Sequence, residues 1–347
     1  MSRLAPLLFL ALPLWPGGCA TVLHEQALVT EEFMVASADP GIELYVRNKR
    51  PASESRFPGE RIVLFVHGST YPAETAFDLP LNGVSWMEYI ARQGYDVYLV
   101  DLRGYGRSTR PPEMDQPAER NAPLTTTSTA VKDVGSAADF IRKRRGVERI
   151  NLLGWSWGTT IMATYATRNT DRVNKLLLYA PQWIRTTPSL IATSGPLGAY
   201  RVVQEDAAKA RWLTGVPETK KAELIPPGWF DAWAAATFSS DPWGAKQSPK
   251  KLRAPNGTQQ DTREYWSAGK AYYEPETIRV PTLLLVGEWD QDTPPYMAQA
   301  LFPKLVNAPY KQLVQIGEAT HTVLMEKNRM QLFRAVQAFL DQPAPRP

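Results

Sequence analysis

The sequence has few of the residues that form disulfide bonds or metal sites. It contains one cysteine, Cys19, so no disulfide can form within the chain. Its three histidines are His24, His67 and His321, and no two of them have the spacing of paired metal ligands. No glycine-rich phosphate loop follows an early strand. We therefore expect a protein that works without a metal ion or a cofactor.

The chain also lacks a strong excess of either charge. Its 39 lysines and arginines and its 35 acidic residues give a net charge of +4. A short basic run over 142–145 ends a helical pattern, where cations interact favourably with the helix dipole. No basic stretch is interleaved with aromatic residues. We therefore expect no nucleic-acid partner.

No apolar stretch approaches the roughly 18 residues of a membrane-spanning helix. The longest one, over 4–15, follows Arg3 and leads into small residues around Cys19. A charged start, a short apolar centre and a small-residue end are typical of a secretory signal. We interpret 1–20 as a signal peptide. The expected location is the periplasm, the outer membrane or the extracellular space.

Two fates of this segment stay open. Cys19 directly follows Gly18 and resembles a bacterial lipoprotein processing site, where the cysteine becomes the lipidated first residue. Pro16 departs from that pattern, because leucine is usual at this position. The alternatives are membrane attachment through a lipidated Cys19 and simple cleavage near Ala20.

The rest of the chain alternates between strand and helix patterns. With 347 residues, of which 44% are hydrophobic, it can form one large core with an insertion. Eight apolar runs predict strands, at 32–36, 42–46, 61–66, 95–100, 150–153, 174–179, 281–287 and 312–316. Helical patterns cover 84–92, 129–145, 159–166 and 325–340. Such alternation predicts an α/β fold with a mostly parallel sheet of eight strands.

One segment interrupts the alternation after the sixth strand. Residues 184–277 contain no clear buried strand, and prolines divide their helical fragments. This segment holds five tryptophans, at Trp212, Trp229, Trp233, Trp243 and Trp266. We interpret it as a helical lid inserted between two parts of the core, 21–183 and 278–347.

A Gly-x-Ser-x-Gly motif joins the fifth strand to the next helix. Gly154 and Gly158 flank Ser156, directly after an apolar run and before a helical pattern. A strand, a sharp turn and a helix in this order form a nucleophile elbow. The glycines avoid clashes at the strained serine. Ser156 is therefore the predicted nucleophile.

A serine nucleophile needs a base, and the base needs an orienting carboxylate. His321 follows the last strand and is the predicted base, because the acid and then the histidine follow the serine along the chain in this fold. Asp290 follows the preceding strand and is the predicted acid. Asp292 is interpreted as the cap of the helix after Pro294, and Glu288 is the least favoured of the three carboxylates.

The oxyanion of an acyl-transfer intermediate needs two fixed N–H donors. The backbone N–H of Trp157, directly after the nucleophile, is one expected donor. The backbone N–H of Ser69, in the loop after the third strand, is the other. His67, in the same loop, is expected to hold the loop and not to catalyse.

Together these motifs resemble the α/β-hydrolase superfamily, in the branch with a helical cap after the sixth strand. The matching residues are His67-Gly68, 101–108, 154–158, 287–290 and His321. The resemblance covers about 32–340, and the serine at the elbow argues against haloalkane dehalogenases. The elbow also resembles that of proline iminopeptidases. Those enzymes carry His-Gly-Gly-Pro-Gly where this chain has His67-Gly68-Ser69-Thr70-Tyr71.

The resemblance implies a secreted or surface-anchored serine hydrolase that acts on hydrophobic carboxylic esters, with a small-molecule ester as its substrate. One alternative is an aminopeptidase, whose substrate amine would need an acidic anchor such as Glu205, Asp206 or Asp231 in the lid. An acyltransferase and a non-catalytic binding protein are further alternatives. The lid tryptophans, together with Trp155 and Trp157, predict an apolar, aromatic-lined pocket. Charged substrates are then expected to be poor, because a lone buried charge is costly.

Overall fold

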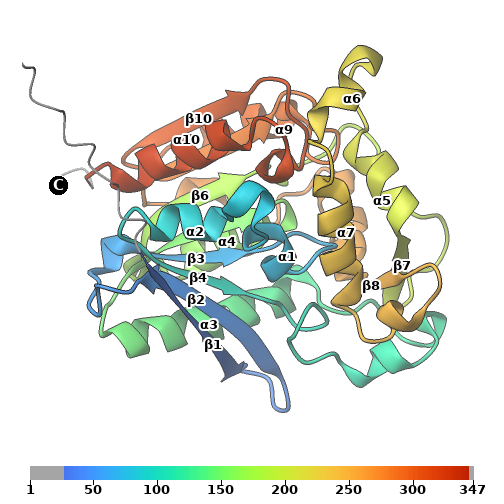
Figure 1. Cartoon of the computed structure of the whole chain (residues 1–347), viewed down its shortest axis with the longest axis horizontal. Coiled ribbons are helices and arrows are strands. Elements are labelled where there is room, and N and C mark those ends of the chain that lie inside the picture. Colours follow the sequence, from blue (N-terminus) through green and yellow to red (C-terminus); the bar gives the residue numbers. More distant parts are fainter. Residues whose placement is uncertain (1–26, 344–347) are drawn as a thin grey trace, which may run out of the picture.

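The computed structural model of the protein describes residues 27–343 (Figure 1). The expected signal peptide over 1–20, with Cys19, lies outside the described residues. Within the described part of the chain, no helix combines the length and apolar character needed to cross a membrane.

A sheet of eight strands forms the centre of the fold, as the sequence predicted. The strand order is β1-β2-β4-β3-β5-β6-β9-β10, with β1 and β2 antiparallel to their neighbours and the remaining pairs parallel. The strands are β1 (Leu28–Ala36), β2 (Glu43–Pro51), β3 (Ile62–Val66), β4 (Asp96–Val100), β5 (Ile150–Trp155), β6 (Val173–Tyr179), β9 (Thr282–Gly287) and β10 (Lys311–Ile316).

The central strands are buried on both faces. In β3, for example, Val63 and Phe65 join one apolar cluster, while Ile62 and Leu64 join the other. Side chains alternate along a strand, so a continuous apolar run is needed when helices cover both faces. The covering helices are α1 (Ala73–Phe77), α2 (Trp86–Ala91) and α10 (Arg329–Asp341) on one face, and α3 (Thr127–Arg145), α4 (Trp157–Arg168) and α9 (Pro295–Leu301) on the other.

Helix ends differ slightly from the predicted ones, for local reasons. Helix α2 begins after Ser85, which caps it: Glu88 N donates to Ser85 Oγ (3.0 Å), and Ser85 N donates to Glu88 Oε2 (3.1 Å). The final helix begins at Arg329, because a separate 3₁₀ turn, Val323–Met325, precedes it.

The segment between β6 and β9 lies at one end of the sheet (Figure 1). Its helices are α5 (Glu205–Trp212), α6 (Lys221–Leu224), α7 (Trp229–Ser239) and α8 (Gly257–Glu264). It also contains an antiparallel pair of strands, β7 (Tyr200–Gln204) and β8 (Lys251–Pro255), that the sequence analysis missed. Every residue of β7 is at least partly exposed, so the strand lacks a buried-strand signal. The predicted lid limits, 184 and 277, both fall inside this segment and remain a prediction.

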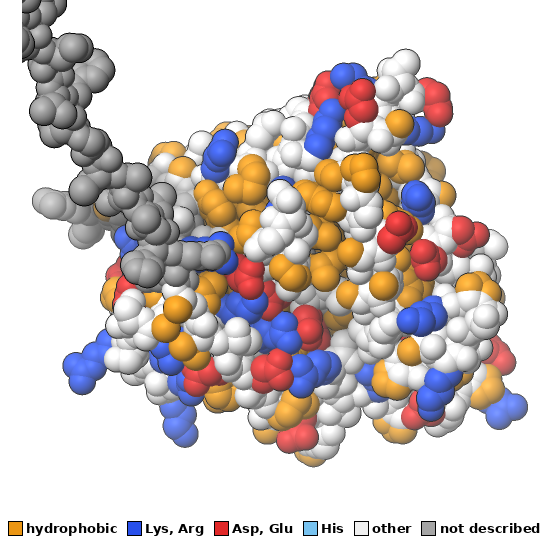
Figure 2. Space-filling view, in the orientation of Figure 1, with side chains coloured by type: hydrophobic (Ala, Val, Ile, Leu, Met, Phe, Trp, Pro, Cys, Tyr) orange, Lys and Arg blue, Asp and Glu red, His pale blue; other side chains and the backbone are white. Residues whose placement is uncertain are grey.

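Opposite charges are mixed on the face shown in Figure 2, next to a broader apolar area. The same mixing is seen around Arg47, which contacts the carboxylates of Glu32, Glu74 and Asp78 at 2.8 to 2.9 Å. The residues around Arg47 therefore form local ion pairs and not a continuous field of one sign.

Candidate active site

Ser156 lies at a strained turn between β5 and α4. Its φ and ψ angles are 59° and −123°, a backbone conformation that residues other than glycine rarely adopt. A Cβ at Gly154 would lie 2.3 Å from the Gly158 carbonyl oxygen, and a Cβ at Gly158 would lie 2.7 Å from the carbonyl oxygen of His67. The two glycines of the motif are therefore required for the tight approach of the chain around Ser156.

His321 and Asp290 are in direct contact. His321 Nδ1 lies 2.8 Å from Asp290 Oδ2, and Asp290 is fully buried. Asp290 also accepts hydrogen bonds from the backbone N–H (2.8 Å) and the hydroxyl (3.0 Å) of Thr293. The carbonyl oxygen of His321 accepts from Trp155 Nε1 (3.0 Å) and Tyr179 Oη (2.6 Å). Both the ring and the backbone of His321 are thus held in place.

The surroundings change the proton affinity of His321. Burial alone would lower its pKa, but the negative charges of Asp290 and Asp292 raise it above the ordinary value. The contact to Asp290 leaves Nε2 as the ring nitrogen available to a substrate or to Ser156. That is the arrangement required of a general base oriented by a carboxylate.

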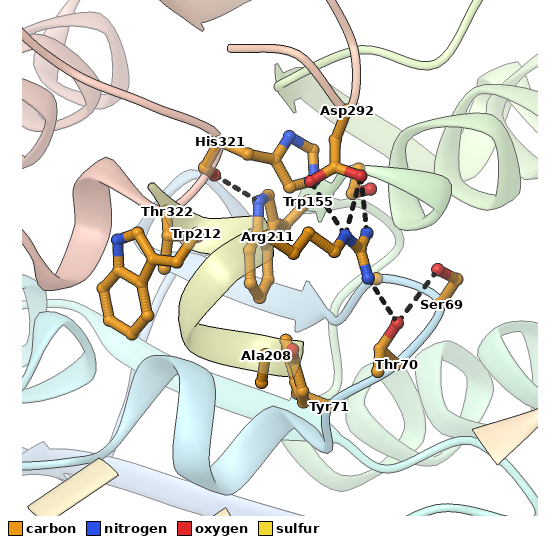
Figure 3. A pocket seen from close by; sticks show the side chains of 12 residues that line it. Ser69, Thr70, Tyr71, Trp155, Ala208, Arg211, Trp212, Asp292, His321 and Thr322 are labelled. Carbon is orange, nitrogen blue, oxygen red and sulfur yellow. Dashed lines mark hydrogen bonds and ion pairs between the residues drawn. The ribbon is translucent and has the colours of Figure 1, made fainter. Parts of the chain in front are cut away.

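Asp292 does not cap the following helix, contrary to the sequence-based interpretation. Helix α9 begins after Pro294 and has no side-chain cap. A proline at the first helical position lacks an N–H, so it needs no capping acceptor. The carboxylate of Asp292 instead pairs with Arg211 of α5, at 2.7 to 3.1 Å (Figure 3). Burial would raise the pKa of Asp292, but the charge of Arg211 lowers it.

The loop after β3 passes directly over Ser156. A Cβ at Gly68 would lie 3.0 Å from Ser156 Cβ and 3.4 Å from its Oγ. Ser69, the next residue, lines the same pocket as Ser156. Trp157 is the first residue of α4, where an N–H has no partner inside the helix. Its indole Nε1 donates to Thr127 Oγ1 (2.7 Å), so the side chain is occupied elsewhere.

His67 connects two loops beneath this site. Its Nε2 accepts a hydrogen bond from Leu102 N (3.1 Å), so Nδ1 carries the proton and donates to the carbonyl oxygen of Gly68 (2.7 Å). Burial lowers the pKa of His67 to about 4, which keeps the ring neutral. These contacts agree with the expected role of holding the loop.

Two cavities adjoin each other at the active site, and of the two only the smaller is lined by Ser156. The first is about 20 Å³, room for about one water molecule. Its lining includes Ser69, Thr70, Trp155, Ser156, Trp212, Asp292 and His321. The second is about 460 Å³ and lies against β7 and α5. Tyr71, Ala208 and Arg211 line both, so they separate the two spaces. Figure 3 shows the Arg211 guanidinium between Asp292 and Thr70.

Of the five lid tryptophans, Trp212 alone lines the cavity at Ser156, together with Trp155 and Tyr71 of the core. Trp233 and Trp266 are fully buried, and Trp243 is 38% exposed. Trp233 packs edge-on against Trp212 (centroids 5.3 Å apart) and against Tyr71 (4.7 Å). These rings hold the lid on the core. The small cavity is lined by polar and charged side chains as well as aromatic ones.

The candidate anchors for a substrate amine do not gather at the site. Asp206 lines the larger cavity, whereas Glu205 and Asp231 are exposed and line neither cavity. Within residues 27–343, no three histidine, cysteine or acidic side chains lie close enough together to hold a metal ion. The sequence analysis did not identify Arg201, Arg211 or Glu326, because no local motif marks them.

Comparison with known proteins identifies the fold family of this chain. The model of the alpha/beta hydrolase fold family matches residues 61–328, well over half of the chain. Human lipase member N is 30% identical over 134 residues, which cover 38% of this chain and 33% of the lipase. The chain matches only 4%, 17% and 35% of the length of three other curated relatives.

Two solved structures share the fold over most of their length. One is a serine hydrolase from the polyaromatic hydrocarbon-degrading bacterium Cycloclasticus zankles, with a TM-score of 0.60, 17% identity, and coverage of 91% of this chain and 98% of that one. The other is a membrane phospholipase A described as a bacterial virulence factor, with a TM-score of 0.58, 21% identity, and coverage of 90% and 86%. At these identities the likeness shows the fold alone. Because the family match covers most of the chain, including six of the eight strands of the sheet, the elbow and the His321 loop, the chain belongs to the alpha/beta hydrolase family.

Proposed function

We propose that this protein is a serine hydrolase that cleaves carboxylic esters through an acyl-enzyme. The observation that carries the proposal is the contact of 2.8 Å between His321 Nδ1 and Asp290 Oδ2, in a pocket that His321 shares with the strained Ser156. The relatives and similar structures include two lipases and an esterase, which supports the ester, and also an epoxide hydrolase and a meta-cleavage product hydrolase.

In the proposed reaction, Ser156 Oγ attacks the ester carbonyl carbon and His321 Nε2 takes its proton. The backbone N–H groups of Ser69 and Trp157 stabilise the resulting oxyanion. Collapse of the intermediate expels the alcohol, which takes the proton from His321. A water molecule, activated by His321, then attacks the acyl-enzyme and releases the acid. Asp290 orients His321 and stabilises its cationic form throughout.

We propose a preference for hydrophobic esters because the larger cavity has apolar walls. The lid tryptophans do not support this preference, because most of them line neither cavity. Leu190, Ile191, Val202 and Val203 line the larger cavity and give it apolar walls. An acyl or alcohol chain placed there would gain roughly 0.8 kcal/mol for each buried CH₂.

The test is the Ser156→Ala variant. It should lose almost all hydrolysis of 4-nitrophenyl esters and all labelling by a fluorophosphonate, while the exposed Ser55→Ala variant keeps both. Full activity in Ser156→Ala would refute the mechanism. Addition of an alcohol acceptor separates the acyltransferase alternative, because a transferase forms the new ester faster than the free acid. Faster cleavage of alanine or proline arylamides than of esters would favour the aminopeptidase.

We also propose that residues 1–20 direct export of the protein, with Cys19 or a residue close to Ala20 as the mature start. The charge and apolar pattern of this segment supports the proposal.

A further inference from the structure

The larger cavity has a composition that the proposed ester hydrolysis alone does not explain. Its volume of about 460 Å³ is within the range of small-molecule sites. Beside its apolar walls it is lined by two arginines, Arg201 of β7 and Arg211 of α5. Arg211 is neutralised by Asp292, at 2.7 Å. Arg201, in contrast, has no carboxylate within ion-pair distance in the described part of the chain.

Arg201 has hydrogen bonds but no countercharge. Its guanidinium donates to the carbonyl oxygens of Pro255 (2.9 Å) and Ser69 (2.7 Å), and to Thr70 Oγ1 (2.8 Å). Among residues 27–343, no carboxylate forms an ion pair with it. Burial lowers the pKa of Arg201 to about 10, so the side chain remains cationic near neutral pH.

Some other arginines with largely buried side chains have a carboxylate partner, whereas Arg329, within residues 27–343, donates only to the backbone carbonyl oxygens of Leu81 and Val84. Three of them each pair with an aspartate at 2.5 to 2.8 Å: Arg103 with Asp133, Arg145 with Asp96, and Arg253 with Asp241. A buried cation without such a partner is costly for the folded protein. An anionic ligand in the cavity would remove that cost.

A second arginine without a carboxylate partner lies on the other side of Ser156. Arg185 is 7% exposed and borders a small recess that also contains Ser156. Its guanidinium donates to the backbone carbonyl oxygens of Thr187 (3.2 Å), Asp292 (2.8 Å) and Pro188 (3.1 Å). Asp290 contacts His321 and the Asp292 side chain contacts Arg211. The charge of Asp292 acts on Arg185 and Arg201 from a distance, and that of Asp290 acts on Arg185, but neither carboxylate forms an ion pair with either arginine. The surroundings of Ser156 thus favour a negatively charged ligand.

One acidic side chain opposes this field. Asp206 also lines the larger cavity, but it is exposed, and its Oδ1 accepts a hydrogen bond from the N–H of Ala207 (2.7 Å). Solvent screens an exposed carboxylate more than the partly buried guanidinium of Arg201. Asp206 therefore weakens the positive potential of the cavity without cancelling it.

We propose that the larger cavity binds the anionic end of an amphiphilic ester, with Arg201 contacting its carboxylate or phosphate group while Ser156 attacks the ester carbonyl. The inference rests on the proposed function and names its substrate class. It reverses the expectation that charged substrates are poor. The apolar walls hold the chain between the two ends. Since Arg201 also donates to Ser69 and Thr70, the bound anion lies next to the loop that carries the expected oxyanion donor.

Two matched substrate pairs test the proposal and separate the two sources of negative charge. Mono-4-nitrophenyl suberate carries a carboxylate on its acyl chain, and 4-nitrophenyl octanoate is its neutral counterpart. Lysophosphatidate carries a phosphate on its alcohol, and monoacylglycerol with the same acyl chain is its counterpart. We expect the wild type to prefer the anionic member of at least one pair in kcat/KM. The preferred pair identifies carboxylate or phosphate as the recognised group.

The Arg201→Gln variant should lower this preference about tenfold to hundredfold, as expected for a lost hydrogen bond to a charged group. Arg201→Lys, which keeps the charge, should retain part of the preference. Lys221→Gln removes a partly exposed lid cation that pairs with Glu218 and lines neither cavity, and should leave the ratio of the two substrates unchanged. If Arg201→Gln slows both members of a pair equally, Arg201 only holds the Ser69 loop and the proposal is wrong. A wild type that prefers the neutral member of both pairs also overturns it.

Binding to the Ser156→Ala variant separates this inference from the proposed function. Calorimetry with monomethyl suberate and methyl octanoate needs no hydrolysis. Tighter binding of the suberate, lost on further substitution of Arg201 by glutamine, supports the anion site even if Ser156 is not the nucleophile. Equal binding of the two esters refutes the anion site, even if fluorophosphonate labelling confirms Ser156 as the nucleophile.

Discussion

Trp212 of the lid donates a hydrogen bond of 2.8 Å from its indole nitrogen to Glu326, a fully buried carboxylate five residues after His321. Glu326 also accepts from the N–H of Thr320 (3.0 Å), the neighbour of His321. Burial raises the pKa of Glu326 to about 7. One carboxylate therefore connects the lid that lines the pocket to the loop that carries the expected base.

The Trp212→Phe variant should be less stable by about 1 to 3 kcal/mol at pH 8.5, where Glu326 is charged, because a buried carboxylate then loses a donor. Urea unfolding measures this loss. A double-mutant cycle with Glu326→Gln isolates the pair from the change in ring packing. Trp243→Phe, at an exposed position, is the control and should change stability little. Additive effects of Trp212→Phe and Glu326→Gln would mean that the hydrogen bond contributes nothing measurable.

The contacts of the carboxylates after β9 predict unequal effects on catalysis. Asp290→Asn should lower kcat by about 10⁴, because the amide favours the wrong tautomer of His321. Asp292→Asn should lower kcat less, because it removes the ion pair with Arg211 of the lid and not the contact with His321. Glu288→Gln, at an exposed position, is the control. Steady-state kinetics of the three variants decide the assignment, and greater loss in Asp292→Asn than in Asp290→Asn would contradict it.

The raised pKa of His321 predicts where activity is lost with pH. Catalysis needs the neutral ring, so kcat/KM should fall as the pH drops through a pKa above the ordinary value of 6.5. Because the charge of Asp292 helps to raise this pKa, Asp292→Asn should move the midpoint to lower pH. A pH profile of kcat/KM for both proteins checks the direction. A wild-type midpoint well below pH 6 would argue against His321 as the base.

We predict that a side chain at position 68 would displace Ser156 or the loop after β3. The Gly68→Ala variant places a methyl group 3.0 Å from Ser156 Cβ, so Ser156 or the loop must move. A displacement of this kind should lower kcat by about tenfold to hundredfold with little change in circular dichroism. Ser69→Ala keeps the backbone N–H that the mechanism uses and should remain active. Unchanged kcat in Gly68→Ala would show that the loop yields without affecting Ser156.

Export can be tested on the mature N-terminus. Mass spectrometry of protein from the native envelope should show a start at Cys19 with a diacylglyceryl group, or an unmodified start near Ala20. The first result supports membrane anchoring and the second a released form. An intact Met1 in the cytoplasm would contradict both.

Much of the catalytic arrangement could be predicted from the sequence, because its signals are local. Strands buried on both faces need continuous apolar runs, and those of β3, β4, β5 and β9 were visible in the sequence. The edge strands β1 and β10 are more exposed, but their shorter apolar runs also predicted strands. The turn at Ser156 needs glycine two residues before and two residues after it, and the structure shows the contacts that require them. Asp290 and His321 each follow a strand, and parallel strands bring such loops to one edge.

Other features were decided only by tertiary structure. Asp292 pairs with Arg211, 81 residues away, and Trp212 with Glu326, 114 residues away. No local pattern encodes such contacts, and a single arginine or tryptophan in a helix looks the same whether it lines a cavity or packs elsewhere. The sequence by itself therefore determined the sheet, the elbow and the order of the expected catalytic residues. The packing of the lid on the core decided which tryptophan reaches the pocket and left Arg201 in the cavity without a countercharge, because both depend on segments that meet only in the folded chain.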